Sequence, residues 1–264
     1  MSCPDLTITS LETLTAFDIA TGSLKFILDE LQNATIANTQ EKNDITGKGG
    51  RKLGSIKRNK GVTISGTNGM LSAGLMEAQT GSAFVNGETT VMRPDYLTVK
   101  DNAATTSYKA VGTTGNEISE VLVKDAGGTV VERLTQSSAA AEGKFAYNPT
   151  SKVLTFNEGD IADGTEIIAC YKRKMIADVL ENMSDVYSSK CELYLDAIGE
   201  DKCANVYRVQ FHLPKADFSG EFSLEFGENQ AVHAFEAESL AGACGAGGSL
   251  WSYTVFGVKT EDVA

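Results

Sequence analysis

A short glycine-rich segment has some features of a phosphate-binding loop. It runs from Gly47 to Ser55 and reads GKGGRKLGS. Such loops work because glycines let backbone N–H groups close on a phosphate, while a lysine and a Ser or Thr hydroxyl complete the site. Here Lys52 stands where the dinucleotide pattern needs its third glycine, and Gly54 is followed by serine rather than by the required Lys-Ser or Lys-Thr. The segment is therefore interpreted as a polar loop, and no cofactor is expected.

The other reactive side chains form no recognisable catalytic or metal-binding pattern. The two histidines, His212 and His233, belong to no HExxH motif, and neither stands beside a Cys or Ser nucleophile motif. The acidic residues from Glu158 to Glu166 could attract Ca²⁺, but they do not follow the spacing of an EF-hand loop. We therefore expect no metal ion and no catalytic residues.

The cysteines and the N-terminus bear on the compartment. The five cysteines contain no CxxC pair, and their odd number is unlike a secreted disulfide framework, so reduced thiols are expected. The N-terminus lacks the basic and apolar regions of a signal peptide, and no stretch approaches the roughly 18 apolar residues that span a bilayer. These features predict assembly in the cytoplasm and no membrane association.

The chain is acidic, with a net charge of −12 over 264 residues. Nucleic-acid binding needs clustered Lys and Arg to neutralise phosphates, so general binding of this kind is disfavoured. An acidic surface would instead suit a channel that DNA passes without binding. The length allows one large β domain or two small ones. No internal repeat or long linker is evident, which favours one domain over residues 1–264, with residues 91–174 as a β elaboration of it or an inserted module.

The elements that would carry these residues are mainly β-strands. Apolar and polar residues alternate over Tyr207–Leu213 and again over Phe218–Phe226, with the short link Pro214–Asp217 between them. Period two on both sides of a short link predicts an antiparallel hairpin with one buried face. Further strands are predicted at Leu24–Leu31, Val62–Ser65, Tyr96–Lys100, Glu117–Lys124, Thr129–Thr135, Lys144–Tyr147, Val153–Phe156, Glu166–Lys172, Cys191–Ala197, Ala231–Ala237 and Leu250–Val258.

One flanking helix is predicted at about residues 70–80. Thr67 or Asn68 could cap its N-terminus, and Gly81 could end it. Its apolar stripe consists of Leu71, Leu75 and Met76. The range Met175–Met183 fits either a second helix or a long strand.

A glycine-rich basic segment stands out at about residues 39–61. Between Glu41 and Lys60 it holds seven basic and two acidic residues, so it carries +5 while the rest of the chain carries −17. It has too few apolar residues to pack as an element by itself, and it is predicted to be a long loop or a projecting hairpin. The candidate contact residues between subunits or rings are Lys48, Arg51, Lys52, Lys57, Arg58 and Lys60.

Four segments carry a family resemblance. Phe17–Leu24, Leu28–Asn38, Asp44–Leu53 and Lys57–Ser72 resemble major tail tube proteins of bacteriophages, most closely those of phages from Gram-positive hosts. The similarity covers about the first 90 residues and, more loosely, Tyr187–Ser239. The middle of the chain, residues 91–174, is less diagnostic.

The resemblance implies a β-sandwich or barrel subunit that forms hexameric rings stacked into a hollow virion tail tube. Neighbouring subunits would join their sheets, and long loops would reach into the adjacent ring. The implied partners are other copies of the chain, the tape measure protein in the lumen, tail terminator and baseplate proteins, and a sheath protein if the tail is contractile. DNA would pass without specific binding, and no catalysis or cofactor is implied. The basic segment would then meet an acidic patch on the next subunit.

Three alternatives are left open. Another virion component, such as a tail completion, baseplate or capsid decoration protein, would share the β-rich composition. A carbohydrate-binding adhesin module would need clustered exposed aromatics, whereas the single tryptophan, Trp251, lies in an alternating strand where core or interface packing is expected. A hydrolase would need carboxylates that are distant in sequence but share a pocket.

Overall fold

The computed structural model describes residues 5–225, 232–240 and 248–257, and it divides the chain into two compact units. The first unit comprises Met1–Phe84 and Leu180–Ala264, and the second comprises Val85–Val179. The protein is mainly β, with two sheets, of which one is a curled half-barrel, and one short helix, as the sequence predicted. The single domain over residues 1–264 and the module at 91–174 stay predictions. Phe226, Ala231, Val258, Cys3 and Cys244 lie outside the described residues.

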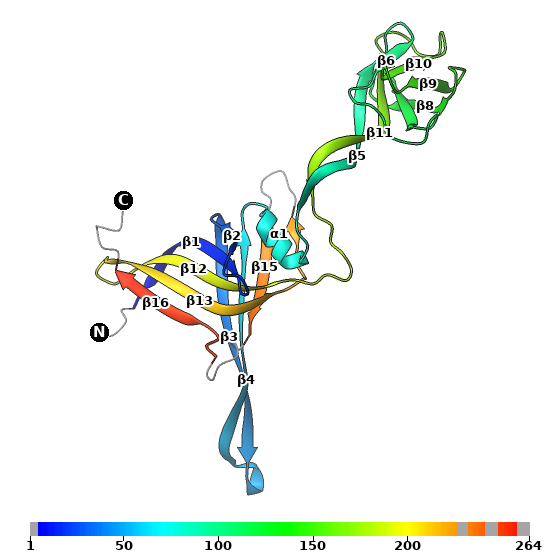
Figure 1. Ribbon diagram of the computed structural model, residues 1–264. Coiled ribbons are helices and arrows are strands. Elements are labelled where there is room, and N and C mark those ends of the chain that lie inside the picture. The colour runs from blue at the N-terminus through cyan, green and yellow to red at the C-terminus, as the bar shows by residue number, and fades with distance from the viewer. Residues whose placement is uncertain (1–4, 226–231, 241–247, 258–264) are drawn as a thin grey trace. The chain divides into compact units, whose positions relative to one another are not determined.

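The first unit is built on a nine-stranded antiparallel sheet (Figure 1). The strand order is β2-β1-β12-β13-β15-β4-β3, with β14 paired to β15 and β16 paired to β13. The strands are β1 (Thr7–Asp18), β2 (Leu24–Leu28), β3 (Leu31–Thr46), β4 (Lys52–Asn68), β12 (Lys190–Glu200), β13 (Val206–Phe218), β14 (Leu224–Glu225), β15 (Val232–Ser239) and β16 (Ser252–Gly257), and the 3-10 turn η1 spans Lys48–Gly50. One face of this sheet carries the unit's core, which includes Leu14, Ile64, Leu193 and Leu213.

The helix α1 (Ala73–Thr80) packs its buried Leu75 and Ala78 into this core. The prediction of the helix and of Gly81 as its end is confirmed, since Gly81 has a φ of 75°, which favours glycine. The predicted N-cap is wrong. Asn68 is still paired within β4, and the cap is Ser72, whose side chain accepts a hydrogen bond from the N–H of Leu75. Leu71 precedes the helix and is exposed, so only part of the predicted stripe is buried.

A buried histidine fastens α1 to the sheet. His233 on β15 accepts a hydrogen bond from the Ser72 N–H at Nδ1 (3.3 Å) and contacts the Gln79 side-chain oxygen through Nε2 (2.8 Å). The Gln79 amide donates in turn to the carbonyl of Ala234 (2.9 Å). The acceptor role at Nδ1 fixes the neutral tautomer protonated at Nε2. Burial away from water lowers the pKa of His233, which keeps it neutral.

The predicted hairpin across Pro214–Asp217 is wrong. The strand β13 continues through this segment to Phe218 and pairs along its length with β12. The register shifts here: β13 passes from Leu213 to Ala216 while β12 passes only from Leu193 to Cys191. This bulge leaves one residue without a ladder partner, which accommodates a proline that has no N–H to donate. Of the later alternating residues, Phe218 ends β13 and Leu224 lies in the short β14, which pairs with β15.

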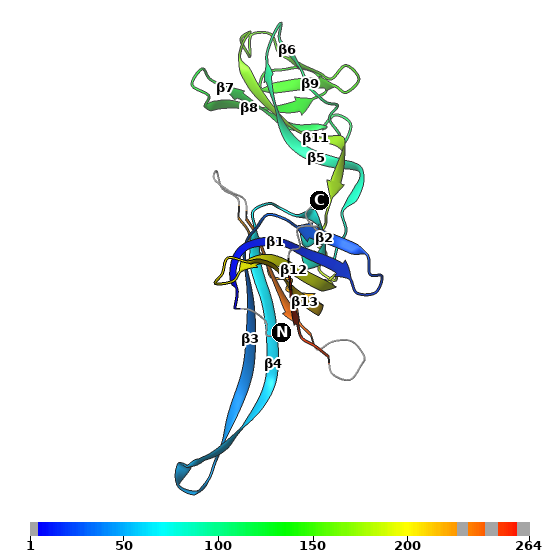
Figure 2. The same cartoon turned by 90° about the vertical axis from the view of Figure 1, so that its left-hand side faces the viewer.

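The second unit is a seven-stranded sheet with a core of its own (Figure 2). The strand order is β5-β11-β7-β8-β9-β10-β6, and all pairs are antiparallel except β8 with β9. The strands are β5 (Val85–Thr98), β6 (Ala103–Thr105), β7 (Ile118–Lys124), β8 (Val130–Ser137), β9 (Lys144–Asn148), β10 (Val153–Phe156) and β11 (Glu166–Val179). Val121, Phe145, Leu154 and Ile167 are fully buried in the core. The ambiguous range Met175–Met183 begins as strand, because β11 continues to Val179.

Candidate assembly surfaces

The basic segment forms the outer half of a long hairpin, here called the arm (Thr39–Gly61). Figure 1 shows β3 and β4 continuing well beyond the rest of the sheet in this region. Along the arm, β3 and β4 pair with each other and with no other described strand. The strand β15 pairs with β4 only over Val62–Asn68. The arm is exposed throughout except for its half-buried glycines 47, 54 and 61. Of the two forms expected from the sequence, the structure therefore has the projecting hairpin.

The six predicted contact residues all lie on the arm, and only one of them has a charged partner there. Lys52 pairs with Asp44 (2.6 Å), and the other acid, Glu41, accepts a hydrogen bond from Asn59 (2.7 Å). Within the described residues, the five others have no ion pair or side-chain hydrogen bond: Lys48, Arg51, Lys57, Arg58 and Lys60. Lys57 even lies directly opposite Lys42, an arrangement that is unfavourable unless an anion lies nearby.

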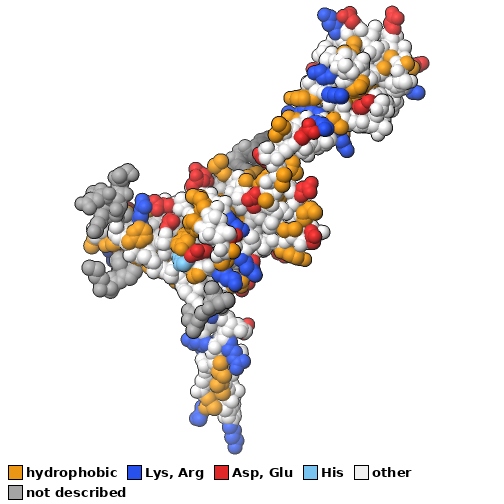
Figure 3. Space-filling model, viewed as in Figure 1, with side chains coloured by type: hydrophobic (Ala, Val, Ile, Leu, Met, Phe, Trp, Pro, Cys, Tyr) orange, Lys and Arg blue, Asp and Glu red, His pale blue; other side chains and the backbone are white. Residues whose placement is uncertain are grey.

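The arm also carries aliphatic side chains that sequence analysis did not single out. Ile45, Leu53 and Ile56 are 46%, 61% and 41% exposed. Ile45 pairs with Gly54 and Ile56 with Asn43, so the two isoleucines are diagonal neighbours on one face of the hairpin. Figure 3 shows hydrophobic side chains along the arm with Lys and Arg on either side. The alternation of Ile56 with polar residues could have predicted a strand here. The interpretation of the segment rested on its charge instead.

An apolar groove lies at the root of the arm. It has a volume of about 370 Å³ and is lined by residues of β1, β3, β12 and β13 together with Trp251. The main lining residues are Ile8, Leu11, Ile36, Leu195, Phe211 and Trp251. Phe211 and Trp251 contact each other with ring centroids 5.9 Å apart. Trp251 thus has the packing role that was expected for it, and its ring lies in a groove that is partly open to solvent.

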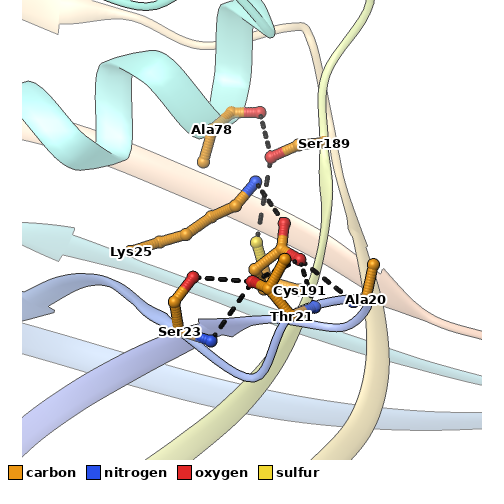
Figure 4. A network of polar contacts seen from close by, with 8 residues as sticks. Ala20, Thr21, Ser23, Lys25, Ala78, Ser189 and Cys191 are labelled. Atoms are coloured by element: carbon orange, nitrogen blue, oxygen red, sulfur yellow. Dashed lines mark hydrogen bonds and ion pairs between the residues drawn. The ribbon is translucent and has the colours of Figure 1, made fainter.

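The edge strand β2 presents exposed aliphatic residues at the border of the sheet. Leu24 and Ile27 are both exposed, and β2 pairs only with β1 among the described strands. Asp18 holds the turn between them, accepting hydrogen bonds from the N–H groups of Ala20 and Thr21 and contacting Lys25 at 3.5 Å (Figure 4). The hydrogen bonds from Thr21 lower the pKa of Asp18. An ordered edge with apolar residues is suited to pairing with another chain.

The sheet face opposite the core is polar and carries acids. The alternate residues of β12 on this face are Glu192, Tyr194 and Asp196, and Asp196 accepts a hydrogen bond from Gln210 (2.9 Å). Glu192 accepts from the Tyr194 hydroxyl (2.8 Å) and contacts His212 Nε2 (2.7 Å). Burial and then the bond to Glu192 raise the pKa of Tyr194 to about 12.

The same face continues across the neighbouring strands. The Tyr194 ring stacks on His212, with centroids 4.4 Å apart, so the histidine is packed against the sheet. On β15, Glu236 and Glu238 extend the acidic character, and they lie opposite Ser65 and Thr63 of β4. Glu192, Asp196, Gln210 and His212 form hydrogen bonds across β12 and β13, which gives an ordered polar surface there.

A scan against protein-family models decides the family. The model of the YomU/Tube protein family matches residues 6–249, which is nearly the whole chain and includes the arm and the second unit. The chain belongs to this family. A search of curated proteins found no match. The YomU/Tube family is a phage tube-type family of structural proteins, so this chain is a tail component of a virion.

The reactive and apolar groups in the described part of this YomU/Tube chain bear on metal binding, acid catalysis and membrane spanning. Among the described residues no three His, Cys, Asp or Glu side chains are placed to hold a metal ion. The acids Asp18 and Asp201 have lowered pKa values, for Asp201 through hydrogen bonds from Asn205, whereas a general acid needs a raised one. No helix in the described ranges is long and apolar enough to cross a membrane. The free thiols described are Cys170, Cys191 and Cys203, and burial raises the pKa of Cys191.

Proposed function

We propose that the protein is a tail tube subunit that assembles into hexameric rings stacked into a hollow tube, through which DNA leaves the virion. The observation that carries this proposal is the arm: an ordered hairpin with exposed aliphatic residues, on which five of the six predicted contact residues have no ion pair with the described residues. Family membership supports the same role. The interactions of such an arm would be completed by another copy of the chain.

Lateral pairing of sheet edges would form the ring. Exposed strand edges with apolar residues are an aggregation liability unless a specific neighbour covers them. The edge at β2, with Leu24 and Ile27 exposed, and the edge at β3 lie at the two ends of the strand order. Joining one end to the other end of the next subunit is a heterologous contact, which closes into a ring when the rotation per subunit allows.

The arm would join one ring to the next. Its isoleucines, Ile45 and Ile56, match the apolar lining of the groove, and its basic residues match the net negative charge of the remaining chain. We propose the groove of a second copy as the receiver. Because β3 supplies both the arm and the groove lining residue Ile36, each subunit would give an arm and accept one, which propagates along a tube.

The polar face would line the lumen. Its carboxylates Glu192, Asp196, Glu236 and Glu238 repel DNA phosphates, so DNA slides instead of binding. The tape measure protein would occupy the same channel before ejection. Terminator and baseplate proteins would contact the ends of the tube, and a sheath protein would surround it if the tail is contractile.

Negative-stain electron microscopy of the purified full chain at high concentration tests the proposal. We expect hollow rods or six-membered rings. A protein that stays monomeric at all concentrations, or that forms only trimers, would instead be a completion, decoration or baseplate component.

A further inference from the structure

The second unit contains a buried arginine without a counter-ion. Arg173 on β11 is only 5% exposed, and its guanidinium carbon lies 4.0 Å from the centroid of the Tyr108 ring. Its Nε is buried and has no hydrogen-bond partner. No carboxylate of the described chain lies within ion-pair distance of its terminal nitrogens. A guanidinium stays charged at any ordinary pH, so this charge contacts the Tyr108 ring but has no counter-ion among the described residues.

The carboxylate on the same face of the sheet is already engaged elsewhere. Asp95 accepts hydrogen bonds from the N–H (2.7 Å) and hydroxyl (2.9 Å) of Ser107 and from the hydroxyl of Tyr171 (2.7 Å). Asp95 pairs with Ala169 across the ladder, whereas Arg173 pairs with Val91 two rows away. Asp95 therefore holds the loop that bears Tyr108 and leaves Arg173 unpaired.

A second guanidinium lies beside the first. Arg93 is directly opposite Tyr171, which puts it on the same face as Arg173 and in the diagonal position across the ladder. Arg93 is exposed, and it has no ion pair with the described residues. Two arginines and the half-exposed ring of Tyr108 thus border one place on the surface, with Arg173 at its floor.

The physical cost of this arrangement points to a ligand. Burying an unpaired charge is unfavourable, and contact with an aromatic face recovers only part of that free energy. A guanidinium presents a planar fork of donors that fits the two oxygens of a carboxylate or the oxygens of a phosphate. We propose that Arg173 and Arg93 bind an oxyanion, either a carboxylate supplied by an acidic side chain or a phosphate group. This site is independent of the arm and of tube assembly.

Thermal melting of the full chain in matched salts tests the site. Sodium phosphate, sodium acetate and sodium chloride are compared at equal ionic strength and pH 7, and isothermal titration with the same anions measures affinity. A ligand that binds only the folded state raises the melting temperature as its concentration rises. We expect phosphate or acetate to do so relative to chloride. A preference for acetate assigns the site to a carboxylate, and a preference for phosphate assigns it to a phosphate group.

The variants locate the effect. Arg93→Gln changes an exposed residue, should fold normally, and should weaken binding about tenfold or more, because charge-assisted hydrogen bonds are lost. Arg173→Met should abolish the anion effect, and it should melt at the same temperature in all three salts. Arg133→Gln is the matched control, since Arg133 is exposed and paired with Glu120 (3.0 Å). An equal anion effect in all four proteins, or none in the wild type, would overturn the proposal.

Discussion

The molecule contains two long antiparallel ladders that differ in net charge and in how many strands pair with them. The ladder β3–β4 in the first unit has three register shifts, and its chain from Leu31 to Asn68 holds seven basic and two acidic residues. The ladder β5–β11 in the second unit runs through fourteen pairs without a shift, and its two strands hold four basic and four acidic residues. Each has one ion pair of 2.6 Å, Lys52–Asp44 and Lys174–Glu88.

The two ladders also differ in their surroundings. The ladder β5–β11 is joined by β7 over Ile167–Tyr171 and shares a core, and its charges balance. Among the described residues, no third strand pairs with the arm and none of the arm's side chains is buried. The arm carries an excess charge of +5. A hairpin in water is marginal by itself, so an ordered arm with an excess of charge supports the proposal that another copy contacts it. The comparison predicts that changes to the arm affect assembly while equal changes to the second unit do not.

Reversing the arm's charge should have the largest effect. Replacing Arg51, Lys52, Lys57 and Arg58 by Glu should abolish tubes, because attraction to an acidic neighbour becomes repulsion, while circular dichroism should show an unchanged fold. The matched control reverses four exposed lysines of the second unit, Lys100, Lys109, Lys144 and Lys172. Its net charge is the same, and electron microscopy should still show tubes. Tubes from the arm variant would end the stacking proposal.

Removing the arm's aliphatic pair should have the next largest effect. Ile45→Ser with Ile56→Ser should raise the concentration needed for tubes about tenfold or more, since burying one such side chain contributes about 1.5–3 kcal/mol. Sedimentation measures this, and the emission of Trp251, the only tryptophan, should shift to the blue on assembly of the wild type. The control Met92→Ser with Ile176→Ser changes residues that are 53% and 78% exposed on the other ladder. If both pairs impair assembly equally, the comparison fails.

Mild acid should distinguish the two units. Burial lowers the pKa of His233 below its unfolded value of about 6.5, so below that pH the unfolded state binds the proton first. The stability of the first unit should therefore be constant above about pH 7.5 and fall as the pH drops through 6.5. The second unit has no histidine. Hydrogen exchange in β12–β13 against β7–β9 should show the loss only in the former, and His233→Gln should remove it while His212→Gln keeps it.

The two internal ion pairs should have the smallest effects. Double-mutant cycles to alanine at Lys52–Asp44 and Lys174–Glu88 should each give under about 1 kcal/mol of coupling in thermal melts, because both pairs are exposed to water. Both couplings should shrink as salt is added. A coupling of several kcal/mol on the arm alone would mean that the arm is rigidified internally and would weaken the argument for a partner.

The sequence was sufficient to predict features that depend only on residues close together in the chain. Alternating side chains located most strands, such as Val153–Phe156, because one buried face imposes period two on the sequence. The end of α1 followed from Gly81, since a positive φ is a local requirement. The length of β13 could not be predicted in this way. Pro214 is tolerated only through a bulge against the Cys191–Leu193 segment of β12, and these residues are far from Pro214 in the sequence.

For the candidate surfaces the division is similar. The excess charge of residues 39–61 and the lack of catalytic motifs were properties of the sequence by itself, since charges and motif spacings can be read without a fold. Only the tertiary structure decided that those cations stand on an ordered hairpin, that Ile45 and Ile56 share a face, and that Ile36, Phe211 and Trp251 line one groove. These facts depend on strand register and on pairing between distant segments, which composition and periodicity do not encode.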